Sequence, residues 1–235
     1  MHFSVIVPLF NEQTNVRRVL AEIPASLATN LEVRSWELIC VNDGSTDRTA
    51  DELARGRTDQ IVIVTLPRNL GKSGALSHGI RAARGEVVGL IDGDLQTSPA
   101  DFGPLLAEMR TGNWDMVHGI RAQRHDGLVR RWSSRIANGV RRTVLGDDFA
   151  DITCPLTVCR RTCLTDIPHF EPFHRYIPHL VRTQGYRVTQ MPVRHFPRTA
   201  DHAKYGVGNR LGVGITSLLA VRWLTRHTVP RRGGD

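Results

Sequence analysis

Cysteine, aromatic residues and long apolar runs are all scarce in this sequence of 235 residues. Its four cysteines are too few for a disulfide framework, and Cys154, Cys159 and Cys163 follow no familiar zinc-binding spacing. We therefore expect buried, reduced thiols rather than a metal site there. The best candidate for a membrane span, residues 211–221, covers about half of the ~20 residues that a spanning helix needs. We expect no bilayer crossing.

Two nucleotide-binding signatures and a secretory leader are also missing. There is no Gly-x-x-x-x-Gly-Lys-Ser/Thr loop, and no Gly-x-Gly-x-x-Gly follows the first apolar run. ATPase and NAD-dependent dehydrogenase functions therefore lose their main support. The N-terminus lacks a charged segment followed by a long apolar one, which predicts a cytoplasmic protein. Because only 6% of residues are aromatic, few groups can stack on bases, and the composition disfavours nucleic-acid binding.

Positive charge dominates the second half of the chain. The 31 lysines and arginines outnumber the 23 acidic residues, which gives a net charge of +8, and the excess lies after residue 120. Such a surface should face an anionic partner, such as a nucleic acid, a membrane or a phosphorylated substrate. Hydrophobic residues make up 40% of the chain, enough for one large core. We expect a single domain over residues 1–235.

Short apolar runs alternate with helical patterns through residues 3–119. The runs lie at 3–7, 36–41, 60–66, 86–91 and 114–119, and the helical patterns at 13–23, 47–55, 72–83 and 99–110. Near-continuous apolar runs are typical of strands that are covered on both faces. Their alternation with helices predicts an α/β fold with a mostly parallel sheet and right-handed crossovers. Ligands then collect at the carboxyl ends of the strands.

Each of the first four predicted strands ends in a polar cluster. The clusters are Pro8, Phe10, Asn11 and Glu12; Asn42, Asp43, Gly44 and Ser45; Arg68, Asn69, Gly71 and Lys72; and Asp92, Gly93, Asp94 and Gln96. A single cluster would be an ordinary turn, because acidic residues and glycine favour turns. Four clusters at one predicted edge of a sheet indicate a ligand site instead.

Asp92 and Asp94 stand two residues apart at the end of the fourth run. In an extended chain both carboxylates point to the same side, where they repel each other unless a cation lies between them. Oxygen ligands suit Mg²⁺ or Mn²⁺, with Gln96 as a further ligand and phosphate in the remaining positions. A solvated Asp-Gly turn is the alternative. The pattern favours a metal-dependent site for a nucleotide diphosphate, in which Asp43 accepts hydrogen bonds from the base or ribose.

Four segments together resemble the family 2 glycosyltransferases of the GT-A fold, and in particular the group of dolichyl-phosphate mannose synthase and bacterial polyprenyl-phosphate glycosyltransferases. They read VIVPLFNE, VNDGSTDRT, PRNLGKSGAL and LIDGDLQTSP. Downstream, HGIRAQRHDGLVRRWSSRIANGVRRTVLG, DITCPLTVCRR and FHRYIPHLVRTQGYRVTQMPVRHFPR look like acceptor-side segments of that group. The resemblance covers residues 3 to about 210. It implies a Rossmann-like sheet with a nucleotide-sugar half at 1–119, an acceptor-side half at 120–206 and an interfacial helix and tail at 207–235.

The resemblance also implies roles for individual residues. The donor-binding set would be Pro8, Phe10, Glu12 and Asp43 for the base and ribose, Asp92, Asp94 and Gln96 for the metal and diphosphate, and Lys72, Gly93, Arg124, Arg198 and Lys204 for the rest of the nucleotide sugar. The acceptor-binding set would be Arg121, Arg131 and His195. The catalytic set would be Asp94, Asp151, Arg121 and Arg131, with Asp151 as a candidate base or acceptor-orienting acid.

The sequence departs from the group's pattern at two places. Phe10 stands where the group usually has tyrosine, so the base loses a hydroxyl contact. Residues 201–206 read DHAKYG where the group has Gly-x-Ser-Lys-Tyr-Gly. The second departure changes the loop expected to close over the diphosphate, and it bears on the acceptor more than on the donor.

The implied reaction is an inverting transfer from a nucleotide sugar of the GDP-mannose or UDP-hexose type to a polyprenyl phosphate. A phosphate monoester has its second pKa near ~6, so the nucleophile is already anionic and needs no strong base. Arginines would clamp the two anionic reactants. One alternative is a family 2 enzyme with a soluble hydroxyl acceptor, in which Asp151 would be an obligatory base. Another is a non-catalytic binder of nucleotides or nucleic acid.

The remaining predictions concern the second half of the chain. The segment 211–227 predicts a helix that lies in the headgroup layer of an anionic membrane through Arg222, Arg226 and His227, or that packs on the core. The first reading places the protein peripherally at the inner face of the membrane. A homo-oligomer or a membrane-protein partner is left open. Arg141 and Arg142 fit a solvated helix face. The histidines at 169, 174 and 179 recur every five residues, which keeps no single helix face, so we expect no metal cluster there.

Overall fold

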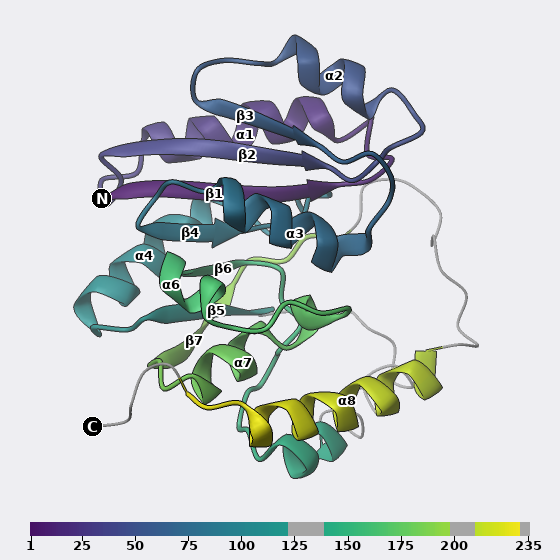
Figure 1. The fold of residues 1–235 in the computed structure, drawn as a ribbon. Helices are drawn as coiled ribbons and strands as arrows, with labels where there is room; N and C mark the ends of the chain where they lie inside the picture. Colours follow the sequence, from purple (N-terminus) through teal and green to yellow (C-terminus); the bar gives the residue numbers. More distant parts are fainter. Residues whose placement is uncertain (122–138, 198–209, 231–235) are drawn as a thin grey trace.

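The computed structural model describes residues 1–121, 139–197 and 210–230, with side chains from Thr216 onward in the last range. Within these residues a seven-stranded sheet has the order β3-β2-β1-β4-β6-β5-β7 (Figure 1). The strands are β1 (His2–Leu9), β2 (Ser35–Asn42), β3 (Ile61–Thr65), β4 (Val87–Leu90), β5 (Met116–Arg121), β6 (Thr157–Arg160) and β7 (Val188–Val193). Each pairing is parallel except those of β6, which runs antiparallel to β4 and β5.

The carboxyl ends of β1 to β4 meet at one edge of the sheet, which we call the carboxyl edge. Leu9 pairs with Asn42, and Asn42 pairs with Thr65, so β1, β2 and β3 end level with one another. β4 joins β1 on its other side, with Leu90 opposite Ile6. The four polar clusters predicted from the sequence therefore follow neighbouring strands at the same edge.

Helices cover both faces of the sheet (Figure 1). They are α1 (Val16–Ala28), α2 (Thr49–Arg55), α3 (Gly71–Ala82), α4 (Phe102–Thr111), α6 (Arg161–Thr165), α7 (Ile177–Thr183), α8 (Arg210–His227), the short 3-10 helices η1 (Pro99–Asp101) and η2 (Phe173–Arg175), and a helical segment at 139–145. Successive residues of β1 point to opposite faces. Val5 packs in one core with α1, α2 and α4, and Ile6 packs in the other with α3, α6, α7 and α8.

All five predicted strands and all four predicted helical segments occur in the first 121 residues, with boundaries that differ by a few positions. Residues 13–15 form a turn, so α1 begins at Val16, and it continues to Ala28. The sequence analysis had no counterpart for β6 or β7. β6 is antiparallel because the chain returns to the carboxyl edge before this strand begins. The mostly parallel sheet is otherwise confirmed.

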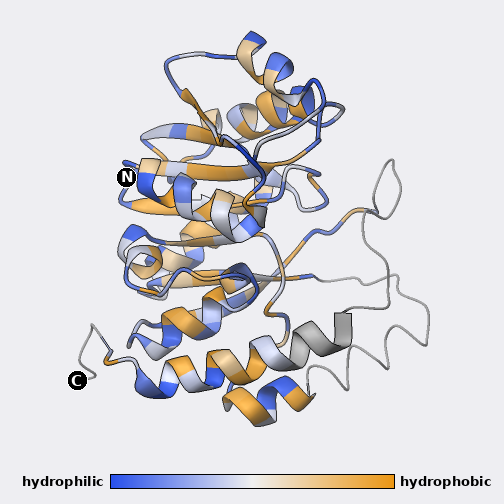
Figure 2. Ribbon diagram, turned by 45° about the vertical axis from the view of Figure 1, so that its right-hand side comes forward, coloured by the Kyte–Doolittle hydropathy of each residue, from blue (hydrophilic) through white to orange (hydrophobic). Residues whose placement is uncertain are grey.

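One side of α8 packs on the core and another faces outward. Leu218 and Val221 are buried, whereas Leu219 and Trp223 are 55% and 62% exposed. Figure 2 shows hydrophobic and hydrophilic residues interspersed along this helix. In the part of the chain that the structure describes, neither α8 nor another helix has the length and apolar character needed to cross a membrane. The packing of this segment on the core is therefore confirmed for Leu218 and Val221, whereas its contact with a membrane stays a prediction.

Candidate active site

Side-chain hydrogen bonds tie the loops after β1 and β2 together at the carboxyl edge. Asn11, with φ of 53°, accepts a hydrogen bond from the Thr46 N–H at 2.8 Å through Oδ1. Its own N–H donates to Oγ of Ser45 at 3.0 Å, and the Glu12 N–H donates to Oγ1 of Thr49 at 2.9 Å. Asparagine tolerates this left-handed backbone conformation better than most residues. The two loops form one continuous structure, which we call the rim (residues 10–15 and 42–49).

Asp43 and Gly44 join the loop after β3 to the rim. The Leu70 N–H donates to Oδ1 of Asp43 at 2.8 Å. Burial raises the pKa of Asp43, although the N–H groups of Leu70 and Gly71 favour the charged form. Gly44 has φ of 65°, and a Cβ atom on it would lie 2.4 Å from the carbonyl carbon of Arg68. Glycine is therefore required where these two loops meet backbone to backbone.

The loop after β4, residues 91–97, alternates between buried and half-buried positions. The half-buried residues are Asp92, Asp94 and Gln96. The segment is nevertheless a turn and not an extended chain, because the Leu95 N–H donates to the Asp92 carbonyl at 3.2 Å and Leu95 has φ of 48°. The Asp-Gly turn, which was the alternative reading of the sequence, therefore occurs, with both aspartates half-buried in it. A Cβ atom on Gly93 would lie 2.3 Å from Cδ2 of Leu9, so the loop packs directly on the end of β1. The Gln96 N–H donates to Oδ1 of Asp94 at 3.2 Å.

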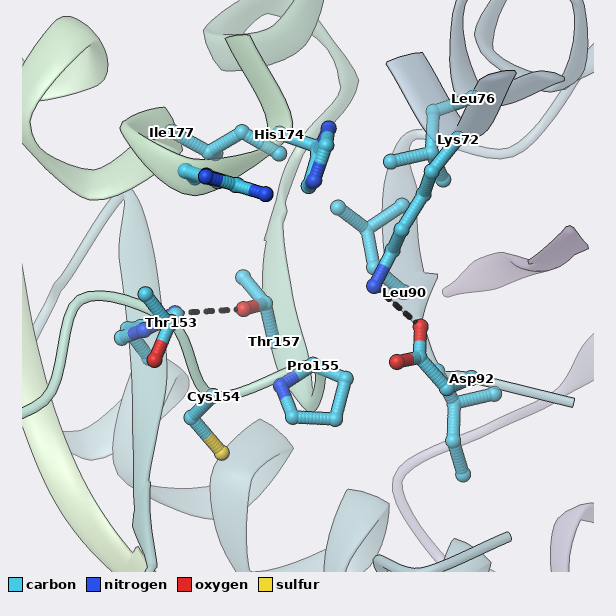
Figure 3. Close-up of a pocket in the computed structure, with 13 residues that line it drawn as sticks. Lys72, Leu76, Leu90, Asp92, Thr153, Cys154, Pro155, Thr157, His174 and Ile177 are labelled. Carbon is cyan, nitrogen blue, oxygen red and sulfur yellow. Dashed lines mark hydrogen bonds and ion pairs between the residues drawn. The ribbon is translucent and has the colours of Figure 1, made fainter. Parts of the chain in front are cut away.

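Lys72, in the first turn of α3, reaches the same loop (Figure 3). Its Nζ lies 2.5 Å from Oδ1 of Asp92, whose side chain is 33% exposed. The carboxylate therefore attracts a cation even from within the protein. Among the described residues no three His, Cys, Asp or Glu side chains are grouped to hold a metal ion. Two carboxylates nevertheless fit Mg²⁺ or Mn²⁺, because such ions commonly take their other ligands from substrate phosphates and water.

Arg121 and Asp151 form a bidentate ion pair where β5 ends. Nε of Arg121 lies 2.7 Å from Oδ2 of Asp151, and Nη2 lies 2.9 Å from Oδ1. Nη2 also donates to Oγ1 of Thr153 at 2.6 Å. The Arg121 and Asp151 side chains are 17% and 11% exposed. Two parallel hydrogen bonds of this kind are strong and directional, so the guanidinium engages both carboxylate oxygens.

The segment after β7 supports the loop that carries the two aspartates. His195 forms an antiparallel bridge with Thr97, and the Phe196 N–H donates to the Gln96 carbonyl at 2.7 Å. His195 therefore reaches the carboxyl edge although about 100 residues separate it from that loop in sequence. Four other predicted residues lie outside the described residues: Arg124, Arg131, Arg198 and Lys204.

A pocket of about 160 Å³ lies beside Lys72 and Asp92 (Figure 3). The other polar residues that line it are His118, Thr153, Thr157, His174 and Arg175. Burial lowers the pKa of His118 to about 4 and that of His174 to about 3, where the positive charges of Lys72 and Arg175 add to the effect. Both imidazoles are therefore neutral at pH 7.

The sequence model of glycosyl transferase family 2 matches residues 4–167, a range that contains the rim, both aspartates of the β4 loop and Asp151. The chain belongs to glycosyl transferase family 2. The resemblance seen in the motifs is thereby confirmed.

Two curated family relatives are similar over most of this chain. Dodecaprenyl-phosphate galacturonate synthase of Rhizobium johnstonii is 33% identical over 97% of this chain and 68% of its own length. Undecaprenyl-phosphate 4-deoxy-4-formamido-L-arabinose transferase of Edwardsiella ictaluri is 32% identical over 87% of this chain and 63% of its own length. The chain thus spans about two thirds of the length of these relatives.

Among solved structures, glucosyl-3-phosphoglycerate synthase of Mycobacterium tuberculosis has the same fold. Its complex with Mn²⁺, UDP and glucosyl-3-phosphoglycerate superimposes with a TM-score of 0.69, at 22% identity, over 99% of this chain and 82% of that one. The expected α/β architecture of a glycosyltransferase is thereby confirmed. The manganese ion and the nucleotide are properties of that enzyme.

Most of the described donor residues predicted from the family 2 motifs lie where the loops converge. Pro8, Phe10 and Glu12 are half-buried along the end of β1, and Asp43 is buried beside them.

The sequence analysis gave no role to His118, Thr157 or Arg175, which line the pocket. His118 lies inside an apolar run, so the sequence predicts a residue of the core there. No sequence motif indicates that His118 and Arg175 would line the same pocket.

One prediction about the second half was wrong. Arg141 does not lie on a solvated face, because it is 6% exposed and its Nη2 lies 3.1 Å from Oδ1 of Asp147. Burial lowers the pKa of Arg141, and Asp147 opposes that effect. Arg142 remains exposed and donates to the Phe149 carbonyl at 3.1 Å. The histidines spaced five apart have separate partners: Ser77 for His169, Ser73 for His174 and Asp147 for His179.

Proposed function

We propose that this chain transfers a sugar from a nucleotide sugar to a polyprenyl phosphate, with inversion at the anomeric carbon. The observation that carries the proposal is the convergence of Asp92, Asp94 and Lys72 with the rim at one edge, where Arg121 and Asp151 also lie. Both curated relatives carry a polyprenyl phosphate in their names, which supports the acceptor class. The two names contain different sugars, so the relatives do not identify the donor sugar of this chain.

On the donor side, Asp92 and Asp94 are the proposed ligands of Mg²⁺ or Mn²⁺, with Gln96 as a further oxygen ligand. When bound, the ion stabilises negative charge on the departing diphosphate. Lys72 supplies a second positive charge at the same place, since its Nζ already lies at the Asp92 carboxylate. The base and ribose would meet Asp43 and the end of β1. Further donor contacts proposed from the resemblance are Gly93, Arg124, Arg198 and Lys204.

On the acceptor side, a phosphate oxygen of the lipid attacks the anomeric carbon. The new oxygen–carbon bond forms as the bond from that carbon to the diphosphate breaks, and the nucleoside diphosphate leaves with the electron pair. No proton has to move, because a phosphate monoester is already mostly ionised at neutral pH. The protein's task is to position two anionic reactants, which is the proposed role of Arg121, Arg131 and His195.

The pairing of Asp151 favours a phosphate acceptor over a hydroxyl acceptor. A hydroxyl nucleophile needs a base in the transition state, and Asp151 is the candidate. Both of its carboxylate oxygens are engaged by Arg121, at 2.7 and 2.9 Å, so it is poorly placed to remove a proton. We propose that Asp151 orients Arg121 towards the acceptor phosphate.

A lipid acceptor requires the enzyme to work at a membrane surface, and α8 is the proposed contact. Leu219 and Trp223 lie one turn apart on its exposed side, and the Trp223 ring stacks on His227 at 4.7 Å between centroids. Arg226 adds positive charge beside them. A helix that exposes an aromatic ring beside basic side chains is suited to the headgroup layer of an anionic membrane, which it contacts without spanning. Its affinity should fall as salt screens the charges.

The test is to incubate the purified protein with Mn²⁺ or Mg²⁺, undecaprenyl phosphate and a panel of UDP- and GDP-sugars, and to measure glycolipid formation. Asp94→Asn should lower turnover at least ~100-fold, because it removes a negative charge that binds the metal ion, and that ion stabilises the departing diphosphate. Asp59→Asn is the matched control, since Asp59 is exposed beside the amino end of β3. Glycosylation of a soluble hydroxyl compound without lipid would favour the alternative acceptor. Full activity of Asp94→Asn would exclude the metal assignment.

A further inference from the structure

The pocket beside Asp92 has the size and lining of a site for one sugar ring. Its volume of about 160 Å³ is below the range of roughly 300–1,000 Å³ that whole drug-sized ligands occupy, so it cannot hold a complete nucleotide sugar. Figure 3 shows Thr153 and Thr157 on the opposite side of the cavity from Lys72 and Asp92. Because Asp92 belongs to the proposed diphosphate site, the space next to it is where the sugar of a bound donor would lie.

The walls of this pocket combine apolar surface with an oriented hydroxyl. Leu76, Leu90 and Ile177 supply apolar carbon atoms that the C–H face of a ring can contact. Oγ1 of Thr157 lies 2.7 Å from Nδ1 of His118, and this buried imidazole fixes the direction of the hydroxyl. A polar group held in this way suits recognition of a ring hydroxyl.

The charges of the residues that line the pocket do not cancel, and the nearby Glu171, 3.9 Å from Nδ1 of His174, is exposed and is not part of the lining. Its charged lining residues are Lys72, Asp92 and Arg175, and Lys72 neutralises Asp92 at 2.5 Å. His118 and His174 carry no charge at neutral pH, because burial lowers their pKa values to about 4 and about 3. Within the described residues the Arg175 side chain has no ion-pair or hydrogen-bond partner. One positive charge, with the planar donor fork that matches an oxyanion, is left at the pocket.

We propose that this pocket receives the transferred sugar and that Arg175 binds a carboxylate carried by its ring, which makes the donor a nucleotide uronate. The inference rests on the proposed function, because it takes the diphosphate to lie at Asp92 and Asp94. The acceptor phosphate is the other oxyanion that could meet Arg175. The position of the pocket beside Asp92, a proposed ligand of the metal and diphosphate, favours the sugar.

The experiment compares UDP-galacturonate and UDP-glucuronate with UDP-galactose and UDP-glucose, using Arg175→Gln, Arg175→Lys and wild-type protein. Wild-type kcat/KM should be about 10- to 100-fold higher for a uronate than for its neutral counterpart, the difference that one hydrogen-bonded charge pair supplies. Arg175→Gln should remove this preference, and Arg175→Lys should keep part of it. UDP-galacturonate affinity, measured by calorimetry with Mn²⁺ and without lipid, should fall in Arg175→Gln, whereas UDP affinity should stay the same.

The matched control is Arg161→Gln, because Arg161 is also exposed but its N–H donates to the Glu86 carbonyl at the opposite edge of the sheet. It should leave the donor preference unchanged. A wild-type preference for neutral sugars would overturn the inference. So would an Arg175→Gln variant that raises KM for the lipid phosphate equally with every donor, since Arg175 would then bind the acceptor. Absence of lipid glycosylation by wild-type protein would instead count against the proposed function, because the calorimetric comparison needs no acceptor.

Discussion

Gly44 offers a direct test of how the rim is built, because two physical costs combine at this one residue. Gly44→Ala forces a side chain into the left-handed region at φ of 65°, at roughly 1–2 kcal/mol. The new Cβ would also lie 2.4 Å from the Arg68 carbonyl carbon and 2.6 Å from the Asn69 nitrogen. Backbone atoms cannot rotate away as a side chain can, so overpacking adds about 1–3 kcal/mol. The expected loss in unfolding free energy is about 2–5 kcal/mol.

Urea denaturation followed by circular dichroism measures this loss, and a thermal scan should show Tm lowered by about 4–20 °C. Calorimetry with UDP should also show weaker binding, because the displaced loop carries Asp43. Gly139→Ala is the matched control. Gly139 lies in a helix with open space around it, so alanine should stabilise the protein by up to ~1 kcal/mol. An ordinary surface substitution changes the free energy of unfolding by about 0.5 kcal/mol or less. If Gly44→Ala changes it by no more than that, the backbone contact is not what fixes this loop.

Three other predictions concern the membrane, the acceptor and acid stability. Trp223→Ser should lower binding to vesicles that contain phosphatidylglycerol several-fold, because it removes the largest exposed apolar side chain of α8. Asp151→Asn should lower kcat by less than the ~100-fold that loss of a general base costs, because we assign Asp151 an orienting role. Between pH 6.5 and about 4 the unfolded chain protonates His118 while the folded chain does not. This group alone should therefore lower stability by up to ~1.4 kcal/mol for each pH unit as pH drops through this window, as measured by urea denaturation at several pH values.

Each of these predictions has a contrary outcome. Unchanged vesicle binding of Trp223→Ser at low and high salt would remove α8 from the membrane contact. A loss of activity in Asp151→Asn as deep as that in Asp94→Asn would restore the base-dependent mechanism. His118→Leu should lower the slope between pH 6.5 and about 4 by up to ~1.4 kcal/mol for each pH unit, while the contribution of His174 remains. An identical slope in that variant would show that His118 does not contribute.

The first half of the fold could be predicted because its signals are local. Buried parallel strands require near-continuous apolar runs, and the polar clusters follow at the point where each strand ends. Since parallel strands bring their carboxyl ends to one edge, Asp43 and Asp92 could be placed near each other before their contacts were known. The boundaries were less certain, because turns such as 13–15 depend on hydrogen bonds to other loops, including those of Asn11.

The second half could not be predicted as well because its elements depend on distant partners. β6 spans only Thr157–Arg160, and its antiparallel direction follows from where the chain re-enters the sheet. Arg141 belongs to a polar helical segment by sequence, and only the packing of residues 147–149 and α7 around it makes it a buried partner of Asp147. Burial of a side chain by segments distant in the sequence cannot be inferred from the residues next to it in the chain.

Sequence alone determined the family, the order of strands and helices in the first half and the aspartates at the strand ends, because these depend on residue type and short-range spacing. Tertiary structure alone decided that Arg121 occupies both oxygens of Asp151, that His195 supports the Asp92 loop and that Arg175 faces a small pocket without a counter-charge. These are facts about pairs of residues that lie tens of positions apart in the chain. Distances between side chains, and the charges left unbalanced among them, exist only once the chain has folded.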